Sequence, residues 1–156
     1  MARVWMAADR IFVRLNSEER AVLSQLPVLV GGVGSDEDDP AAGRMTPNAY
    51  ADDAEAAEEF SSMTAGDLDA ARRRDAGVFA QTLDDIGDTG MTLEEAEAWV
   101  RMIGDSRLVL AARAGVDQGS GLPEPSTADP RIALVHYLGA LQNDVVEALL
   151  STMADA

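Results

Sequence analysis

The stretch TLEEAEAWVRMIGDSRLVLAARAGV, residues 92–116, carries the clearest helical pattern in the chain. Thr92, followed three residues later by Glu95, forms a capping box, in which each side chain accepts a hydrogen bond from the other residue's backbone N–H. At about 100° per residue, one apolar face then runs along the segment. Its members are Leu93, Ala96, Trp99, Val100, Ile103, Leu110 and Ala114. Arg107 falls within this face, so the sequence predicts a central core helix that carries an arginine among its apolar residues.

The last long segment, DPRIALVHYLGALQNDVVEALLSTM, predicts a second core helix. Asp129 is suited to the N-cap and Pro130 to the first helical position. The centre of its apolar face consists of Leu134, Leu138, Leu141, Val145 and Leu149. Gln142 lies within that face, which makes it a second polar residue of the same kind as Arg107. Val146 and Leu150 widen the apolar stripe beyond one face, and we therefore expect a homodimer through this helix.

The N-terminal part predicts a small β element followed by a helix. Residues 3–15, RVWMAADRIFVRL, are rich in β-branched and aromatic side chains, with AAD as a turn, which is typical of a short hairpin or a single strand. Asn16 and Glu19 form a capping box for the helix that follows. Pro27 lacks a backbone N–H and must kink or split that helix.

The middle of the chain predicts two further helices and two loops. Asp52 with Glu55 marks one helix start, and Thr64 with Asp67 marks another, which ends at the turn GDTG, residues 87–90. Segments 31–47 and 116–130 are rich in Gly, Asp and Pro and are expected to be flexible loops. The chain thus predicts a single domain over 1–156, mainly α, with a five-helix orthogonal bundle and a short N-terminal strand or hairpin.

The charge balance and the missing residue types exclude several functions. Asp and Glu number 28 against 12 basic residues, a net charge of −16, which repels phosphate and argues against direct nucleic-acid binding. The one dense basic run, Arg72 to Arg74, lies close to Asp69 and Asp75 and is interpreted as a solvated helix face. No cysteine is present, which excludes disulfides and thiolate chemistry, and no lysine, which excludes Schiff bases.

The lengths of the apolar runs predict the compartment and whether the chain contacts a membrane. No apolar run approaches the roughly 20 residues that cross a bilayer. The N-terminus MARVWMAADR lacks the apolar core of a secretory signal. We therefore expect a cytoplasmic protein without membrane contact.

Catalytic and metal-binding patterns are weak. His136, the one histidine, falls nearly opposite the apolar centre of its helix and has no nucleophile beside it in the sequence, so a hydrolytic or metal enzyme built on it is the least favoured hypothesis. The segment DDIGDTGMTLEEA, residues 84–96, fails as a calcium loop because Ala96 stands where a bidentate Glu is needed. No glycine-rich phosphate motif is present. We expect no enzymatic activity, no cofactor and no bound metal.

Arg107 leaves two roles open. A guanidinium keeps its charge, so a buried one needs a carboxylate or several carbonyl acceptors. The acidic segments 52–59 and 67–69 offer Asp53, Glu59 and Asp67. Arg107 then either reaches the surface or closes a structural ion pair, or it forms the floor of a groove for a ligand or partner. The candidate polar core or groove residues are Arg107, Gln142, Asp53 and Glu59. On the opposite side of the same helix, Arg101 and Asp105 are expected to form a surface ion pair.

The motifs of both core helices resemble a known family. Trp99 is followed by D–x–R–L–x–L, from Asp105 to Leu110, and the last helix carries Y–L–x–x–L–Q, from Tyr137 to Gln142. With residues 47–68, these motifs resemble an actinobacterial domain-of-unknown-function family that includes the AosR-like oxidative-stress regulators. Arg107 and Gln142 match recurring positions of that pattern, which implies a shared structural role.

The resemblance also implies a kind of function. Some members of that family act as redox-responsive transcriptional regulators through a cysteine pair and a partner sigma factor; this chain has no cysteine, so the sensing chemistry is not carried over. We expect a non-enzymatic, cytoplasmic regulatory or interaction protein that binds a transcription or stress-response partner such as a sigma factor. The alternative is a small-molecule binding domain in which Arg107 anchors an anionic ligand.

Overall fold

The computed structural model describes residues 2–33, 38–45, 54–116, 119, 121–125 and 129–154, without the side chains of 54–66. Two strands, β1 (Arg3–Ala7) and β2 (Arg10–Arg14), precede the helices. The helices are α1 (Ser17–Ser24), α2 (Leu26–Gly31), α3 (Pro40–Met45), α4 (Ala54–Leu83), α5 (Leu93–Arg113) and α6 (Pro130–Ala154). Counting α1 and α2 as one helix interrupted beside Pro27, the described residues form five helices and a two-stranded hairpin. The prediction of a mainly α fold with an N-terminal hairpin is confirmed.

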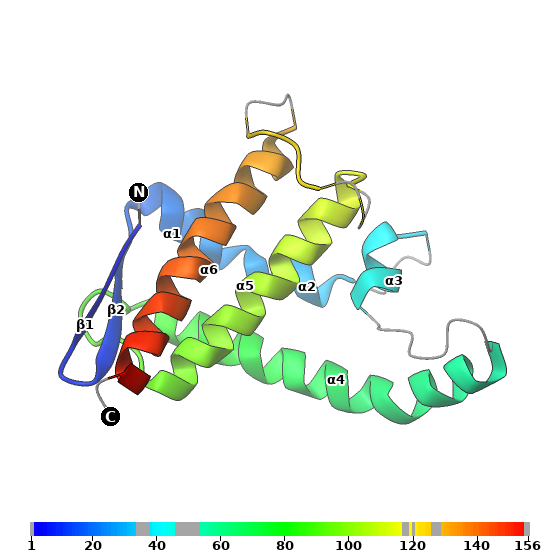
Figure 1. The fold of residues 1–156 in the computed structure, drawn as a ribbon, viewed down its shortest axis with the longest axis horizontal. Coiled ribbons are helices and arrows are strands. Elements are labelled where there is room, and N and C mark those ends of the chain that lie inside the picture. Colours follow the sequence, from blue (N-terminus) through cyan, green and yellow to red (C-terminus); the bar gives the residue numbers. More distant parts are fainter. Residues whose placement is uncertain are drawn as a thin grey trace.

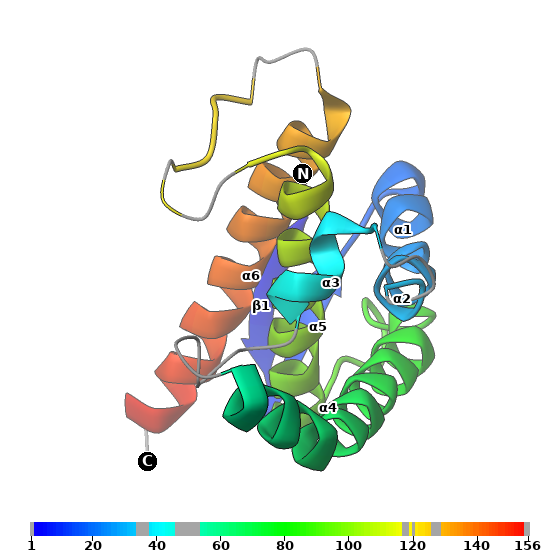
Figure 2. The ribbon, with the colours of Figure 1, turned by 90° about the vertical axis from the view of Figure 1, so that its right-hand side faces the viewer.

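Helix α5 lies at the centre of the molecule. It runs antiparallel to α6 along its length, while α4 crosses α5 at a steep angle (Figure 1). Seen from the side, α6 lies on one flank of α5, α1 and α2 lie on the other, and α3 covers its C-terminal half (Figure 2). The helix that the opening stretch predicts is therefore the one around which the others pack.

The hairpin closes one end of the bundle. Ala8 (φ 51°) and Asp9 (φ 64°) both adopt left-handed backbone angles, as the two central residues of a type I′ turn require. Ile11 of β2 is fully buried and exchanges backbone hydrogen bonds of 2.9 and 2.7 Å with Met91. This pairing fixes the hairpin to the turn that precedes α5.

Helix starts follow the sequence closely. The capping boxes Asn16–Glu19 and Thr92–Glu95 both form, and their hydrogen bonds are 2.7 to 3.1 Å long. Pro27 lies in the first turn of α2, after the break at Gln25, so the predicted split of this helix is confirmed. Asp129 accepts a hydrogen bond from the backbone N–H of Arg131 at the start of α6.

Two expectations for the middle of the chain are wrong. No separate helix starts at Thr64, because α4 (Ala54–Leu83) continues through that residue. No proline interrupts it, and a capping signature ends a helix only where the backbone leaves helical angles. Segment 31–47 is not a loop throughout, because α3 occupies 40–45. There Pro40 stands at the first helical position, and Asp39 accepts a 3.0 Å hydrogen bond from the Ala41 N–H.

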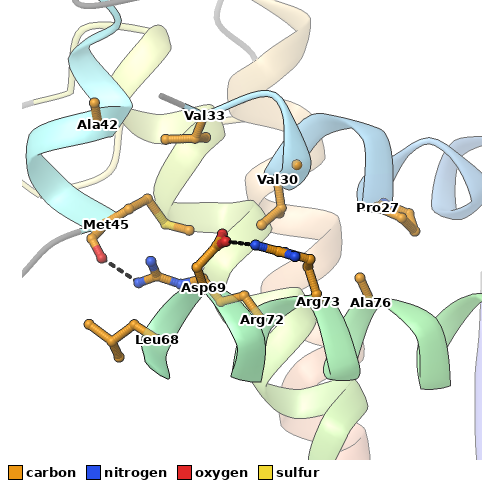
Figure 3. Close-up of a pocket in the computed structure, with 11 residues that line it drawn as sticks. Pro27, Val30, Val33, Ala42, Met45, Leu68, Asp69, Arg72, Arg73 and Ala76 are labelled. Carbon is orange, nitrogen blue, oxygen red and sulfur yellow. Dashed lines mark hydrogen bonds and ion pairs between the residues drawn. The ribbon is translucent and has the colours of Figure 1, made fainter. Parts of the chain in front are cut away.

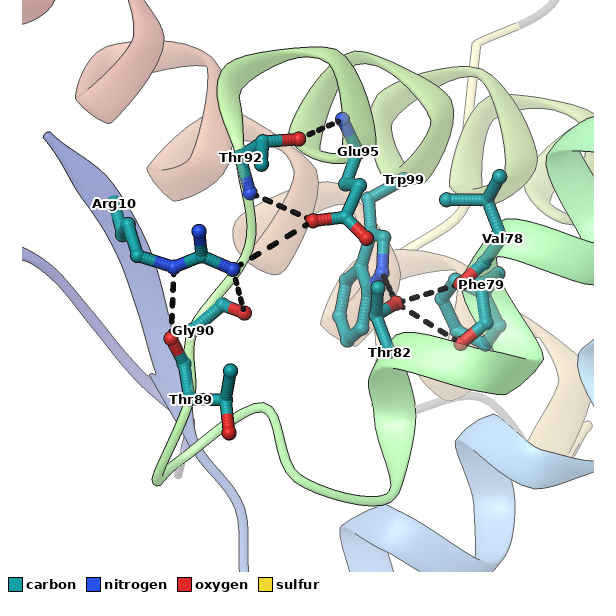
Figure 4. A network of polar contacts seen from close by, with 9 residues as sticks. All are labelled: Arg10, Val78, Phe79, Thr82, Thr89, Gly90, Thr92, Glu95 and Trp99. Atoms are coloured by element: carbon teal, nitrogen blue, oxygen red, sulfur yellow. Dashed lines mark hydrogen bonds and ion pairs between the residues drawn. The ribbon is translucent and has the colours of Figure 1, made fainter.

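The core surrounds α5 and takes buried side chains from β2, from α1 to α4 and from α6. Phe79 of α4 and Trp99 of α5 are both fully buried, with ring centroids 4.5 Å apart. The Trp99 indole donates a 2.6 Å hydrogen bond to Thr82, and nearby the Arg10 side chain donates to the carbonyls of Thr89 and Gly90 (Figure 4). In the described ranges, no helix is sufficiently long and apolar to span a bilayer.

Candidate functional site

Arg107 and Gln142 meet between α5 and α6. The Arg107 Nη1 donates a 3.0 Å hydrogen bond to Gln142 Oε1, and Gln142 Nε2 donates a 2.9 Å bond to the Val100 carbonyl. The two polar residues that interrupt the apolar faces of the predicted helices are therefore partners. Their contact joins the two long helices through polar atoms in a mainly apolar interface.

Two glycines make room for these side chains. A Cβ at Gly139 of α6 would lie 3.1 to 3.3 Å from three atoms of the Arg107 guanidinium, and a Cβ at Gly104 of α5 would lie 3.0 Å from Gln142 Nε2. Each helix thus carries a glycine three residues before its polar residue, and each polar side chain lies over the glycine of the other helix. We call these four residues the polar clamp.

The carboxylate expected beside Arg107 is not found among the described residues. Within the described ranges, the Arg107 side chain makes a hydrogen bond to Gln142, and the Arg107 Nε is buried without an acceptor. Asp67 is exposed and forms no ion pair with it within this part of the chain. Asp53 and the side chain of Glu59 lie outside the described residues. An unsatisfied buried donor is costly, so this guanidinium is a candidate site for an added acceptor.

A cavity of about 370 Å³ lies beside the clamp. Its lining includes two arginines, Arg107 from α5 and Arg44 from the last turn of α3. Helix α3 is held against α5 by Arg113, which pairs with Asp39 at 2.7 and 3.2 Å. Hydrogen bonding from this guanidinium lowers the pKa of Asp39 below its ordinary value. The rest of the lining is mainly apolar: Leu108, Ala111, Val116, Leu122 and Val135.

The expected surface pair of Arg101 with Asp105 is wrong. Arg101 instead makes a bidentate pair with Asp75 of α4, at 2.9 and 3.0 Å. Asp105 faces Arg72 of α4 at 3.7 Å, and burial raises the pKa of Asp105 above its ordinary value. Both side chains pair with residues of α4, which crosses α5 and carries the opposite charges. A helical wheel of α5 alone does not show these partners.

A second hollow, of about 310 Å³, lies between α2, α3 and α4 (Figure 3). Two arginines of the basic run line it, and both are engaged: Arg72 donates to the Met45 carbonyl, and Arg73 pairs with Asp69. Arg74 is exposed. The basic run therefore contributes mainly to contacts within the described part of the chain, in line with its interpretation as a helix face.

An apolar groove of about 670 Å³ lies at the other end of the molecule, between the hairpin, the start of α5 and the end of α6. Its apolar side chains are Met6, Leu93, Val146, Leu149, Leu150 and Met153. Leu150 is 56% exposed and Met153 is 71% exposed. Asp9 and Glu97 also line the groove, and no basic residue in the described part of the chain does. We call this feature the α6 groove.

A comparison with known families assigns the chain. The model of a family described as a domain of unknown function, DUF2017, matches residues 1–149. The chain belongs to the DUF2017 family. No curated protein and no solved structure matches it.

His136 is partly exposed, and its Nε2 donates to the Pro123 carbonyl at 2.7 Å, which fixes the segment before α6. No group of three or more His, Asp or Glu side chains able to hold a metal occurs among the described residues.

Sequence reasoning found part of these candidate sites. It selected Arg107 and Gln142, which interrupt apolar faces, and named Val146 and Leu150 as surplus apolar residues. It missed Arg44, because that residue lies in a segment expected to be a loop. It also missed that Met6 and Asp9 line the α6 groove, since nothing in the hairpin sequence indicates which end of α6 the hairpin contacts.

Proposed function

We propose that this DUF2017 protein is a non-enzymatic, cytoplasmic regulatory protein that binds a protein partner in the α6 groove. The proposal includes the finer placement among actinobacterial, AosR-like regulators that the motifs around Arg107 and Gln142 suggest. The observation that carries it is the exposure of large apolar side chains along a groove with acidic residues at its margin. Clustered exposed apolar surface commonly marks a site of association.

The chemistry of the groove favours one kind of occupant. Its apolar residues come from α5, α6 and the hairpin, so it offers a concave surface to the apolar side of an amphipathic helix. Asp9 and Glu97 are exposed within it, and Asp144 and Glu147 line an adjoining hollow that shares Met6. A helix with apolar residues on one side and Arg or Lys on its flanks complements this arrangement.

The charge of the whole chain acts in the same direction. A net charge of −16 raises the rate of association with a basic partner and disfavours binding to nucleic acid. A sigma factor, or another transcription or stress-response protein with an exposed basic helix, fits this description. Because the chain has no cysteine, we expect the association to be independent of thiol oxidation.

Site-specific photocrosslinking tests the proposal. A photoreactive amino acid is placed at Leu150 and, as control, at Val28, which is 74% exposed on α2 and outside the groove. In cells of the organism that encodes the chain, Leu150 is expected to capture one defined protein, and the crosslinked peptide is expected to contain a basic amphipathic helix. Val28 is expected not to capture it.

The purified partner then gives the quantitative measurement. The double variant Leu150→Gln/Met153→Gln is expected to weaken binding by at least tenfold, and Val28→Gln to leave it unchanged. Binding is also expected to weaken as salt is raised. Crosslinks that join only two copies of this chain, with a dimer in light scattering, would replace the partner by the homodimer. Equal capture at Leu150 and Val28 would contradict a role for the groove.

A further inference from the structure

The cavity beside the polar clamp concentrates positive charge in a strongly acidic protein. Two arginines, Arg44 and Arg107, line it, and among the described residues no Asp or Glu does. In the described part of the chain, the cavity and the α6 groove have no lining residue in common. It is therefore a separate feature, and a role for it does not depend on the proposed function.

Most other arginines of the described chain are already neutralised. Six of the 12 form ion pairs with a carboxylate within the described ranges. These six are Arg10, Arg72, Arg73, Arg101, Arg113 and Arg131. Arg44 and Arg107 form no such pair there, although acidic residues outnumber basic ones by 28 to 12. That two arginines lacking a carboxylate partner line one cavity indicates a place for an anion from outside.

The guanidinium of Arg107 is fixed in position before any ligand arrives. Gln142 holds Nη1 at 3.0 Å, Gly139 lies against the plane of the group, and the buried Nε lacks an acceptor. A guanidinium with its orientation already set loses little freedom when it binds a carboxylate or phosphate.

The remaining lining determines the rest of the ligand. Leu108, Leu122 and Val135 give the cavity an apolar wall, and its volume of about 370 Å³ falls in the range of small-molecule sites. We propose that this cavity binds a small organic anion, with a carboxylate or phosphate on Arg44 and Arg107 and a short apolar body against that wall.

Matched eight-carbon probes test the proposal. Octanoate, octyl phosphate and neutral 1-octanol are titrated into the full chain and followed by amide NMR. We expect one or both anions to bind at least tenfold more tightly than 1-octanol, because the charged hydrogen bonds are lost in the alcohol. The anion that binds more tightly identifies the headgroup. The shifted amides are expected around residues 104–111, 122 and 135, and not around Leu150.

Variants decide which residues bind the anion. Arg44→Gln is expected to weaken anion binding about tenfold while preserving the fold, since Arg44 makes no hydrogen bond among the described residues. Arg74→Gln removes the same charge from an exposed site on α4 and is expected to change nothing. Arg107→Gln also breaks the clamp, so its melting temperature is measured alongside its affinity.

Three results would overturn this assignment. They are equal affinity for the anions and 1-octanol, undiminished binding in Arg44→Gln, and amide shifts confined to the α6 groove. The groove double variant Leu150→Gln/Met153→Gln is expected to bind the anion normally. Loss of partner binding and loss of anion binding are therefore distinguishable.

Discussion

The indole of Trp99 lies in the core with its one polar atom satisfied by a single side chain. Its Nε1 donates to Thr82 Oγ1 at 2.6 Å, and that hydroxyl donates to the Val78 carbonyl at 2.8 Å (Figure 4). Helical periodicity placed Trp99 on the buried face, but it gives no information about which residue of another helix accepts the indole proton. The same holds for Arg107 and Gln142, because the sequence singled out both residues but not the hydrogen bond between them.

Replacing Thr82 tests how much this hydrogen bond contributes. Thr82→Val keeps the shape of the side chain but leaves the buried indole N–H without an acceptor, so we expect the free energy of unfolding to fall by about 1–3 kcal/mol. Thr82→Ser keeps the hydroxyl and is expected to lose less. Urea denaturation followed by circular dichroism measures both variants. No loss in Thr82→Val, or a larger loss in Thr82→Ser, would contradict a stabilising role for the hydroxyl.

At the scale of elements, the pairing of α5 with α6 depends on two glycines at matching positions. Gly104 precedes Arg107 by three residues, and Gly139 precedes Gln142 by three, so each polar side chain packs on the glycine of the facing helix. An isolated sequence gives no reason to prefer this pairing. In helix-forming segments, an interior glycine is otherwise simply unfavourable.

Alanine at Gly139 tests this close approach. Gly77 of α4 is a matched control, because a Cβ there meets no atom within 4 Å, and Gly77→Ala is expected to raise the free energy of unfolding by about 0.5–1 kcal/mol. At Gly139 the new Cβ lies 3.1 to 3.3 Å from three atoms of the Arg107 guanidinium, so the clamped group must shift by a few tenths of an ångström. We therefore expect Gly139→Ala to be less stable than Gly77→Ala by about 1 kcal/mol or more.

A double-mutant cycle identifies the cause of that difference. In the Arg107→Met background the flexible thioether yields space, so Gly139→Ala is expected to regain much of the helical benefit. If the effect of Gly139→Ala were the same in both backgrounds, contact with Arg107 would not be the reason for the glycine.

Element boundaries show where local sequence is sufficient and where it is not. The capping boxes of α1 and α5 and the break at Pro27 depend on neighbouring residues only, and they were predictable. The continuity of α4 through Thr64 was not predictable, because the backbone stays helical there although Thr64 and Asp67 match the pattern of a helix start. The pairing of Arg101 with Asp75 was also out of reach, since it arises only when α4 crosses α5.

Across the whole molecule, the ends of the chain are tied together by a charged hydrogen bond. Tyr137 of α6 donates to the Glu19 carboxylate of α1 at 2.6 Å, over a separation of 118 residues. Burial alone would raise the pKa of Glu19, but the bonds from Tyr137 and from the Asn16 backbone lower it below its ordinary value of 4.5. Burial and the same bond raise the pKa of Tyr137. The folded protein therefore favours the ionised Glu19.

Glu19→Gln tests this coupling through its pH dependence. Because the pKa of Glu19 is lower in the folded chain, its stabilising contribution is complete above pH 4.5 and is lost as the pH falls through the lowered pKa. We expect Glu19→Gln to cost about 1 kcal/mol at pH 7, and the difference from wild type to shrink toward pH 3. The repulsion among 28 acidic residues also fades as the pH falls, so the exposed neighbour variant Glu18→Gln serves as the charge control. Thermal denaturation from pH 3 to 7 measures all three chains, and a pH-independent gap between Glu19→Gln and wild type would contradict the assigned role of the carboxylate.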